Sequence, residues 1–221
     1  MFGRAGKAEV ELETGEFVSV EGVRLHYLSR GRGRPVVLLH GNSGFAHDFA
    51  SVLEALDGKE FRALAFDRPG HGLSERPALD GAMSTQAGLI RGALRELGVR
   101  RPIVVGHSWG AALALAYALQ FAEEVAALVL LAPAVYREDE MYAAQRILVE
   151  IPMLSDLLIR ASETFVRAEI KRNLERAFSP DELPLEYLQA AESLWARPSQ
   201  VRAYMQDEYG YNPAVELLTP R

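Results

Sequence analysis

The 221-residue sequence contains no cysteine. This absence excludes disulfide bonds, thiolate metal sites and a cysteine nucleophile, so any catalytic chemistry must be built from oxygen and nitrogen atoms. Long apolar runs are lacking too. The first sixteen residues hold no stretch of roughly 7–15 apolar residues such as a secretion signal requires. The most apolar stretch, Val125 to Leu131, is far shorter than the roughly 20 residues of a membrane-spanning helix. Together these absences favour a cytoplasmic location.

A net positive charge is also lacking. The formal net charge is −6, so no overall positive field is present to hold a nucleic-acid backbone. Hydrophobic residues make up 49% of the chain and charged residues 24%, which is the balance of an ordinary globular protein rather than of a disordered one. A chain of this length can form one domain with a substantial buried core. We therefore expect neither a nucleic-acid partner nor a membrane partner.

From Phe17 onward, short β-branched runs alternate with helical patterns, which predicts a mostly parallel central sheet with helices on both faces. The expected strands are 17–20, 23–28, 35–39, 61–66, 103–105 and 126–131, and the expected helices are 48–56, 85–97 and 111–119. After Pro133 no strand pattern appears, and four or five helices are expected, broken at prolines. The sequence thus predicts an α/β core over residues 17–135, an all-helical cap over 136–215, and the start of a return to the core over 216–221.

The strongest chemical signal is the pentapeptide Gly106-His107-Ser108-Trp109-Gly110, which lies between an expected strand and an expected helix. A serine on such a sharp turn is held in a strained backbone conformation, and only small residues two positions before and after it let the two arms approach. The turn exposes the serine hydroxyl, and the helix N-terminus adds partial positive charge beside it. This context predicts that Ser108 is a nucleophile. The alternative is a glycine-rich turn with an incidental serine.

A second turn, His40-Gly41-Asn42, directly follows a buried strand. Such a turn can aim a backbone N–H group at a carbonyl under attack. Asn42 is the expected donor, and the backbone N–H of Trp109 is its expected partner, because the residue after the nucleophile lies beside the forming oxyanion. We interpret His40 as a structural hydrogen-bonding residue rather than a proton carrier.

A third loop, Asp67-Arg68-Pro69-Gly70-His71-Gly72-Leu73-Ser74, places two glycines and a proline after a strand. Its composition indicates unusual backbone angles at the sheet edge. We therefore interpret the loop as architectural, and we do not expect His71 to be a catalyst.

Together with residues 23–27 and 36–41, these three elements resemble the α/β-hydrolase superfamily, in its serine esterase and haloperoxidase-like branch. The resemblance runs from about residue 17 to residue 133, followed by the helical cap. It implies a mostly parallel sheet, a cap over the active site, and attack by Ser108 on a small-molecule acyl substrate without a cofactor or metal. It also implies an acid and then a histidine, in that order, after the nucleophile.

The sequence departs from this pattern because none of its five histidines follows Ser108. His107 is adjacent to the nucleophile, and neighbouring residues at a strand end point to opposite faces. His47 could approach the pocket from the first helix, and Glu138 or Asp139 could supply an acid. The simplest interpretation is a chain that ends before the final strands of the fold, whose partner is the missing C-terminal lobe carrying the acid and histidine. The 221-residue chain would then be nearly inactive by itself.

Three functions remain open at this stage. The first is a serine hydrolase that cleaves an ester, thioester or amide through an acyl-serine intermediate. The second is haloalkane-dehalogenase-like or perhydrolase activity, since the pair Asn42 and Trp109 is similar to the halide-binding pair of the dehalogenases. Those enzymes use an aspartate, whereas a serine would form an ether that water cannot cleave by attack at a carbonyl. The third is a binding protein that kept the fold and lost the catalytic residues.

Overall fold

The structure is a computed structural model that describes residues 15–56, 58, 60–77, 81–136 and 152–218. Six strands form one sheet in the order β1-β2-β4-β3-β5-β6. Their bounds are β1 Glu16–Val20, β2 Val23–Gly31, β3 Arg34–Leu39, β4 Phe61–Phe66, β5 Ile103–His107 and β6 Ala127–Leu131. The pairs β1–β2 and β2–β4 are antiparallel, and the pairs β4–β3, β3–β5 and β5–β6 are parallel. The carboxyl ends of β3, β4 and β5 therefore meet at one edge of the sheet.

Local sequence explains how the chain enters this sheet. Glu21 and Gly22 join β1 to β2 with φ angles of 52° and 85°, the positive values that a two-residue hairpin turn demands. In β3, Val37 and Leu39 belong to one hydrophobic cluster, whereas Val36 and Leu38 belong to the cluster on the opposite face. An apolar strand covered on both faces is expected in the parallel part of a sheet.

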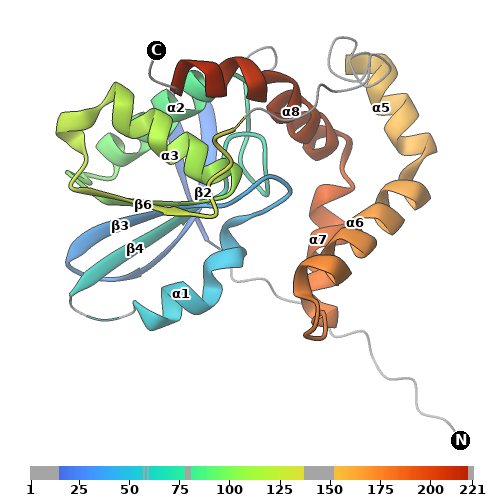
Figure 1. Cartoon of the computed structure of the whole chain (residues 1–221), viewed down its shortest axis with the longest axis horizontal. Helices are drawn as coiled ribbons and strands as arrows, with labels where there is room; N and C mark the ends of the chain where they lie inside the picture. The colour runs from blue at the N-terminus through green and yellow to red at the C-terminus, as the bar shows by residue number, and fades with distance from the viewer. Residues whose placement is uncertain (1–14, 57, 59, 78–80, 137–151, 219–221) are drawn as a thin grey trace, which may run out of the picture.

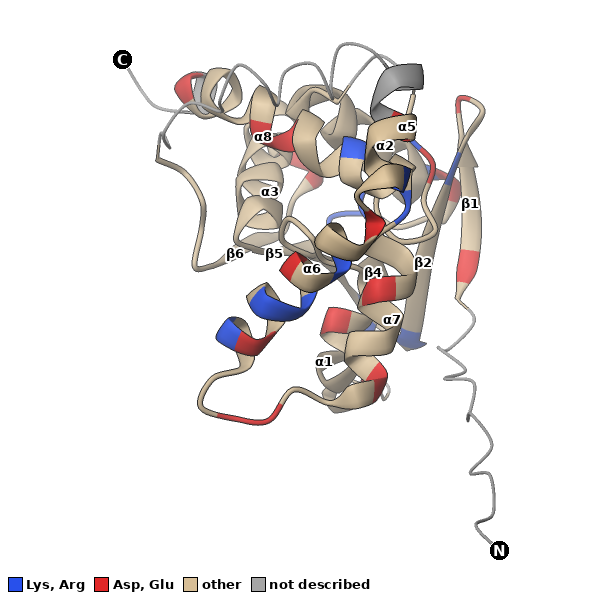
Figure 2. Cartoon of the chain, turned by 90° about the vertical axis from the view of Figure 1, so that its right-hand side faces the viewer, with Lys and Arg blue, Asp and Glu red and all other residues tan. Residues whose placement is uncertain are grey.

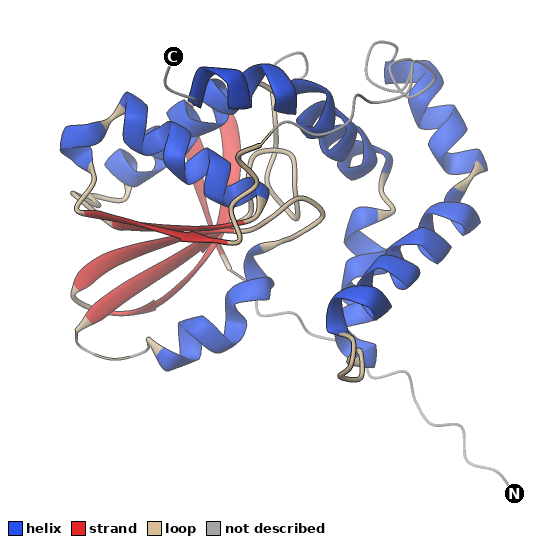
Figure 3. Ribbon diagram, viewed as in Figure 1, coloured by secondary structure: helices blue, strands red, loops and turns tan. Residues whose placement is uncertain are grey.

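Helices cover both faces of the sheet (Figures 1 and 3). On one face lie α2, Met83–Glu96, and α3, Trp109–Gln120, which contribute Ala87, Ile90 and Leu113 to the larger cluster. On the other face lie the 3-10 turn η1, Ala46–Phe49, and α1, Ala50–Ala55. A second 3-10 turn, η2, spans Ala122–Glu124 before β6.

In the described part of the chain after β6, four further helices follow, namely α5 Pro152–Ala161, α6 Glu163–Phe178, α7 Leu185–Trp195 and α8 Pro198–Leu218. They form a separate group beside the sheet, and α8 runs back across its top toward α2 and α3 (Figure 1). Tyr211 and Val215 of α8 are buried in the larger core cluster. Along α6, charges of both signs alternate (Figure 2), and they pair within the helix, as in the i,i+4 pair of Glu163 with Arg167. We call α5 to α8 the cap helices.

The strand β6 lies at the end of the sheet and, among the described residues, pairs only with β5. Val129 is 40% exposed and Leu131 is 44% exposed, which is unusual for apolar residues of a parallel strand. A search of the described residues finds no helix that is long and apolar enough to cross a membrane.

The fold class expected from the sequence is confirmed. The strand predicted over Phe61–Phe66 has the same first and last residues as β4. The main difference concerns the helix expected from residue 111, which begins at Trp109 immediately after Ser108. The division into core and cap at residues 135 and 215 stays a prediction.

Candidate active site

Ser108 lies between β5 and α3, at the carboxyl edge of the sheet. Its backbone has φ 52° and ψ −119°, a region that a residue with a side chain adopts only under strain. The strain is held by backbone hydrogen bonds on both sides: Ser108 N–H donates to the carbonyl of Leu131 at 2.9 Å, and the N–H of Ala111 donates to the carbonyl of Ser108 at 3.0 Å. The turn thus places Ser108 immediately before the first residue of α3, between strand and helix as the sequence predicts.

The two glycines of the pentapeptide are required by the close approach of backbone segments. A Cβ atom on Gly106 would overlap the carbonyl oxygen of Gly110 and the Cα atom of Ala111. A Cβ atom on Gly110 would overlap the carbonyl oxygens of Leu39 and His40. Any larger residue would push the helix off the strand, because backbone atoms cannot move aside as a flexible side chain can.

The turn at residues 40–42 lies directly beside Ser108. A Cβ atom on Gly41 would lie 3.2 Å from the Cβ atom of Ser108. His40 holds this turn: its Nδ1 atom is 2.7 Å from the carbonyl oxygen of Gly41, and its Nε2 atom accepts a hydrogen bond of 2.9 Å from the N–H of Arg68. Burial, reinforced by the positive charge of Arg68, holds the pKa of His40 well below its ordinary value. His40 is therefore neutral and structural, as interpreted from the sequence.

Arg68 is the residue that links the two expected oxyanion donors, a role that its sequence motif does not predict. It is fully buried, and its Cζ atom lies 4.1 Å from the ring centroid of Trp109. Its Nη2 atom donates to the carbonyl of Gly41 at 3.3 Å and reaches Oδ1 of Asn42 at 3.5 Å. Its Nη1 atom pairs with Oδ2 of Asp207 at 2.7 Å.

Asp207 comes from α8 and is completely buried in a polar cluster. Besides Arg68, it pairs with Arg76 at 2.5 Å, accepts a hydrogen bond from Gln86 at 2.9 Å, and lies 2.9 Å from Nε2 of His71. The positive charges of Arg76 and Arg68 hold the pKa of Asp207 below its ordinary value against the opposing effect of burial. No sequence motif marks Asp207, because a single acidic residue on a helix is normally solvent-exposed.

The loop at residues 67–74 has the architectural role expected of it. The carboxylate of Asp67 accepts hydrogen bonds from the N–H groups of Ala46 at 2.6 Å and Leu73 at 2.8 Å, and it pairs with His26 at 2.7 Å. Gly72 has φ 57°, and a Cβ atom there would overlap this carboxylate. His71 is buried, and burial followed by the charge of Arg68 lowers its pKa to about 4. It therefore acts as a neutral donor to Asp207.

A second grouping of serine, histidine and aspartate, formed between this loop and β2, is not a triad. The hydroxyl of Ser74 donates to the backbone carbonyl of Asp67 at 2.7 Å and accepts from the backbone N–H of His26 at 2.8 Å. The imidazole of His26 pairs with Asp67, but both side chains are buried. The cluster joins β2 to the loop, and its serine is not exposed to a substrate.

The described residues place no hydrogen-bonded acid and histidine beside Ser108. Within the described part of the chain, no hydrogen bond joins a histidine to its hydroxyl. His107 is exposed and His47 is half-buried. The candidate acids Glu138 and Asp139 lie outside the described residues. Among the residues that the structure describes, no group of histidine and acidic side chains could hold a metal ion.

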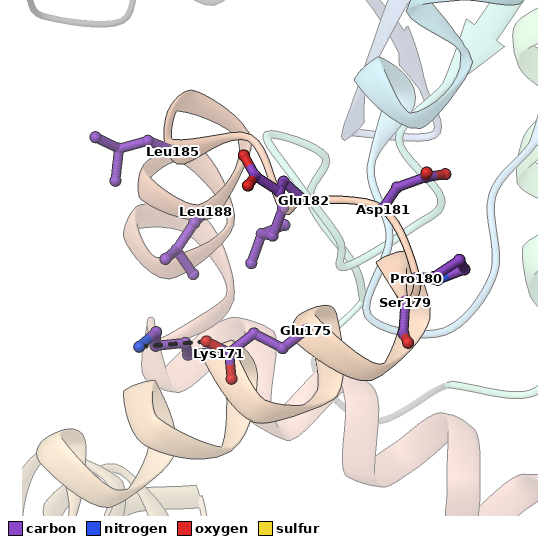
Figure 4. A pocket seen from close by; sticks show the side chains of 9 residues that line it. Lys171, Glu175, Ser179, Pro180, Asp181, Glu182, Leu185 and Leu188 are labelled. Carbon is purple, nitrogen blue, oxygen red and sulfur yellow. Dashed lines mark ion pairs between the residues drawn. The ribbon is translucent and has the colours of Figure 1, made fainter.

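A hollow of about 470 Å³ lies between α6 and α7, and it is separate from the turn at Ser108. Figure 4 shows its lining, which includes the ion pair of Lys171 with Glu175 and the acidic side chains of Asp181 and Glu182. None of its lining residues comes from the sheet. It is therefore not the site at which Ser108 would act.

The turn at Ser108, the glycine contacts and the neighbouring turn at Gly41 place the chain in a known family. The family model described as "alpha/beta hydrolase fold" matches residues 34–194. The chain belongs to the α/β hydrolase fold family. The match includes the turn at Ser108, the loop at residues 67–74 and most of the cap helices, so the family assignment suggested by the sequence motifs is confirmed.

Relatives within the family carry several names. Over 108 residues the chain is 35% identical to a protein named haloalkane dehalogenase 2 from Mycobacterium bovis, a match covering 48% of this chain and 37% of that protein. Over 131 residues it is 37% identical to a 2-hydroxy-6-oxononadienedioate/2-hydroxy-6-oxononatrienedioate hydrolase from Paraburkholderia phymatum, covering 55% and 45% respectively. The matches thus span less than half the length of these relatives.

Solved structures show the same fold. The epoxide hydrolase CorEH superposes with a TM-score of 0.76 at 24% identity, covering 93% of this chain and 76% of that one. At this identity the likeness establishes the fold alone.

Proposed function

We propose that Ser108 is the nucleophile of a serine hydrolase that cleaves an ester, thioester or amide through an acyl-serine intermediate. The observation that carries the proposal is the strained turn at Ser108, with φ 52° and two glycines whose Cβ atoms would overlap neighbouring backbone. Such a turn exposes a hydroxyl at the point where a helix begins. The backbone N–H groups of Asn42 and Trp109 would stabilise the oxyanion that forms when the hydroxyl attacks a carbonyl.

Relatives named as dehalogenases and epoxide hydrolases raise the question of whether this chain shares their reactions. Attack by a carboxylate on an alkyl halide or epoxide gives an ester, which water can then cleave at its carbonyl. Attack by Ser108 would give an ether, which has no carbonyl to receive water. The identity of the proposed nucleophile therefore favours an acyl substrate, with perhydrolase activity as a side reaction of the same acyl-serine.

The proposal needs an acid and a histidine that the described residues do not place near Ser108. We propose that these groups belong to a further segment of the fold, which would also cover the exposed side chains of Val129 and Leu131 on β6. The competing proposal is a binding protein that kept the turn without the proton-transfer residues. The two proposals differ in whether Ser108 reacts as an activated nucleophile.

An organophosphonate probe separates them. We expect the full-length gene product to be labelled on Ser108, located by mass spectrometry after proteolysis. Ser43 is a matched control, because it also has a positive φ angle, 53°, and lies one residue from Asn42. A label on Ser43 or Ser74 with Ser108 unmodified would refute the assignment, and no label on any serine would favour the binding protein.

A further inference from the structure

We propose that Arg68 is the positioning residue of the oxyanion hole and that Asp207 holds it in place, so that docking of the cap helix α8 completes the hole. This inference rests on the proposed function, since it concerns the donors Asn42 and Trp109. Arg68 and Asp207 are 139 residues apart in the sequence, and both side chains are completely buried. The guanidinium lies between the two donors and the cap helix.

The guanidinium of Arg68 contacts both sides of the hole. It stacks on the ring of Trp109, with 4.1 Å from Cζ to the ring centroid, and so restrains the residue whose N–H follows the nucleophile. From the other side, Nη2 donates to the carbonyl of Gly41 at 3.3 Å and approaches Oδ1 of Asn42 at 3.5 Å. The planar fork of arginine can make these contacts together, whereas the single ammonium of lysine cannot.

A buried guanidinium would be costly without a compensating charge. Asp207 supplies it through the 2.7 Å pair with Arg68. Asp207 also has its own support, because Arg76, Gln86 and His71 all contact its carboxylate. The position of Arg68 is therefore set by a carboxylate that belongs to α8 and not to the sheet.

The next residue of α8 reaches the hole as well. Oε1 of Glu208 accepts a hydrogen bond of 2.6 Å from the side-chain amide of Asn42. Consecutive carboxylates of one cap helix thus contact the two sides of the hole, Asp207 through Arg68 and Glu208 through Asn42. Movement of α8 away from the sheet would remove both contacts together, and the donors would lose their fixed geometry.

The functional test is the rate at which a fluorophosphonate labels Ser108 in the full-length gene product, separated into the binding constant and the maximal rate constant. For Arg68→Met we expect the maximal rate constant to fall about tenfold or more, with little change in binding. This is less than the roughly 10²–10³ lost when an oxyanion-hole donor is removed outright. Asp207 keeps Arg76 as its partner in this variant. Arg68→Lys should recover only a small part of the rate.

A matched control is Arg91→Met. Arg91 also stacks on an aromatic ring, with 4.3 Å from Cζ to the centroid of Phe121, and also pairs with a carboxylate, that of Glu124. It lies on α2 and contacts neither expected donor. The maximal rate constant should be unchanged in this variant. An unchanged rate constant in Arg68→Met or in Arg68→Lys would overturn the proposal for Arg68.

A second measurement does not depend on activity. The 221-residue chain has two tryptophans, so a ¹⁵N-tryptophan spectrum shows the backbone and indole N–H signals of Trp109 and Trp195 only. Arg68→Met and Asp207→Asn should shift or broaden the Trp109 signals and leave those of Trp195, in α7, in place. Unchanged Trp109 signals would refute the positioning role even if labelling of Ser108 were confirmed. Failure of the wild-type protein to label at Ser108 would instead refute the proposed function.

Discussion

The backbone of Gly41 packs against the side chain of Ser108, so that a Cβ atom on Gly41 would lie 3.2 Å from the Cβ atom of the serine. The contact follows from the order of the sheet. Strands β3 and β5 are parallel neighbours, and Leu39 is opposite Gly106 in their register. The residues that follow each strand must therefore meet at the same edge. Two turns distant in sequence form one site because their strands are adjacent.

Replacement of Ser108 by alanine should abolish catalysis while leaving the fold intact. In the full-length gene product we expect the turnover number to fall by roughly 10⁴–10⁶, the scale seen when a triad nucleophile is removed. Ser108→Ala retains the Cβ atom and the same backbone strain, and so the free energy of unfolding should barely change. Steady-state hydrolysis and urea denaturation measure the two quantities. A large loss of stability would mean that the hydroxyl is structural.

Replacement of Gly106 by alanine should destabilise the protein by about 3 kcal/mol or more, because the new Cβ atom meets backbone atoms on the facing arm of the turn. Gly88→Ala is the matched control. Gly88 lies inside α2, and a Cβ atom there would have no neighbour within 4 Å. Alanine at this position should stabilise the helix by about 0.5–1 kcal/mol. Equal effects of the two substitutions on the urea midpoint would contradict the proposed packing of the turn.

Much of this arrangement could be predicted from the sequence, because local signals encode it. Alternation of apolar runs and helical patterns gave the six strands, and the pentapeptide around Ser108 identified the turn. The role of His40 as a hydrogen-bonding residue also followed from its place after a buried strand. In each case the relevant physical constraint lies within a few neighbouring residues.

The cluster around Arg68 could not be predicted in this way. Its partner Asp207 comes from a helix 139 residues further along the chain. Nothing in the local pattern of α8 distinguishes Asp207 from an exposed acidic residue, and its burial depends on how α8 packs on the sheet. Arg68 itself lies in a loop whose glycines and proline already explained its composition. Long-range pairing of buried charges is a property of the tertiary structure alone.

Protein stability should fall as the pH is lowered from about 6.5 toward 4, and His71 should account for part of the loss. The imidazole has an ordinary pKa of 6.5 and a folded-state pKa of about 4. Between these values the unfolded chain binds a proton that the folded protein does not, so the free energy of unfolding decreases as the pH falls. The shift corresponds to about 3 kcal/mol in total. His40, whose pKa is also lowered, should contribute in the same direction.

The variant His71→Gln isolates the contribution of that residue. Glutamine can still donate to Asp207 but does not titrate, so the difference in unfolding free energy between about pH 7 and about pH 4.5 should become smaller. His107→Gln is the control, because this histidine is exposed. Urea denaturation at both pH values provides the measurement. The same pH dependence in His71→Gln as in the wild type would show that His71 does not carry the effect.

The 221-residue chain by itself should be almost inactive, although it contains the proposed nucleophile Ser108 and both expected oxyanion donors. Because the described residues place no hydrogen-bonded base beside Ser108, its hydroxyl should stay protonated and be a poor nucleophile. An oxyanion hole and substrate binding alone leave roughly 10³–10⁴ over the reaction in water, far below a working hydrolase. Co-expression with a segment of the fold that carries an acid and a histidine should restore turnover, because that segment would complete the site and cover β6.

Hydrolysis of p-nitrophenyl butyrate by the chain, by the combined polypeptides, and by the combination carrying Ser108→Ala provides the comparison. Rapid turnover by the purified chain alone, abolished by Ser108→Ala, would contradict the prediction. Because His26, His40 and His71 are buried and His107 is expected to point to the opposite face from Ser108, that result would leave His47 to act as the base.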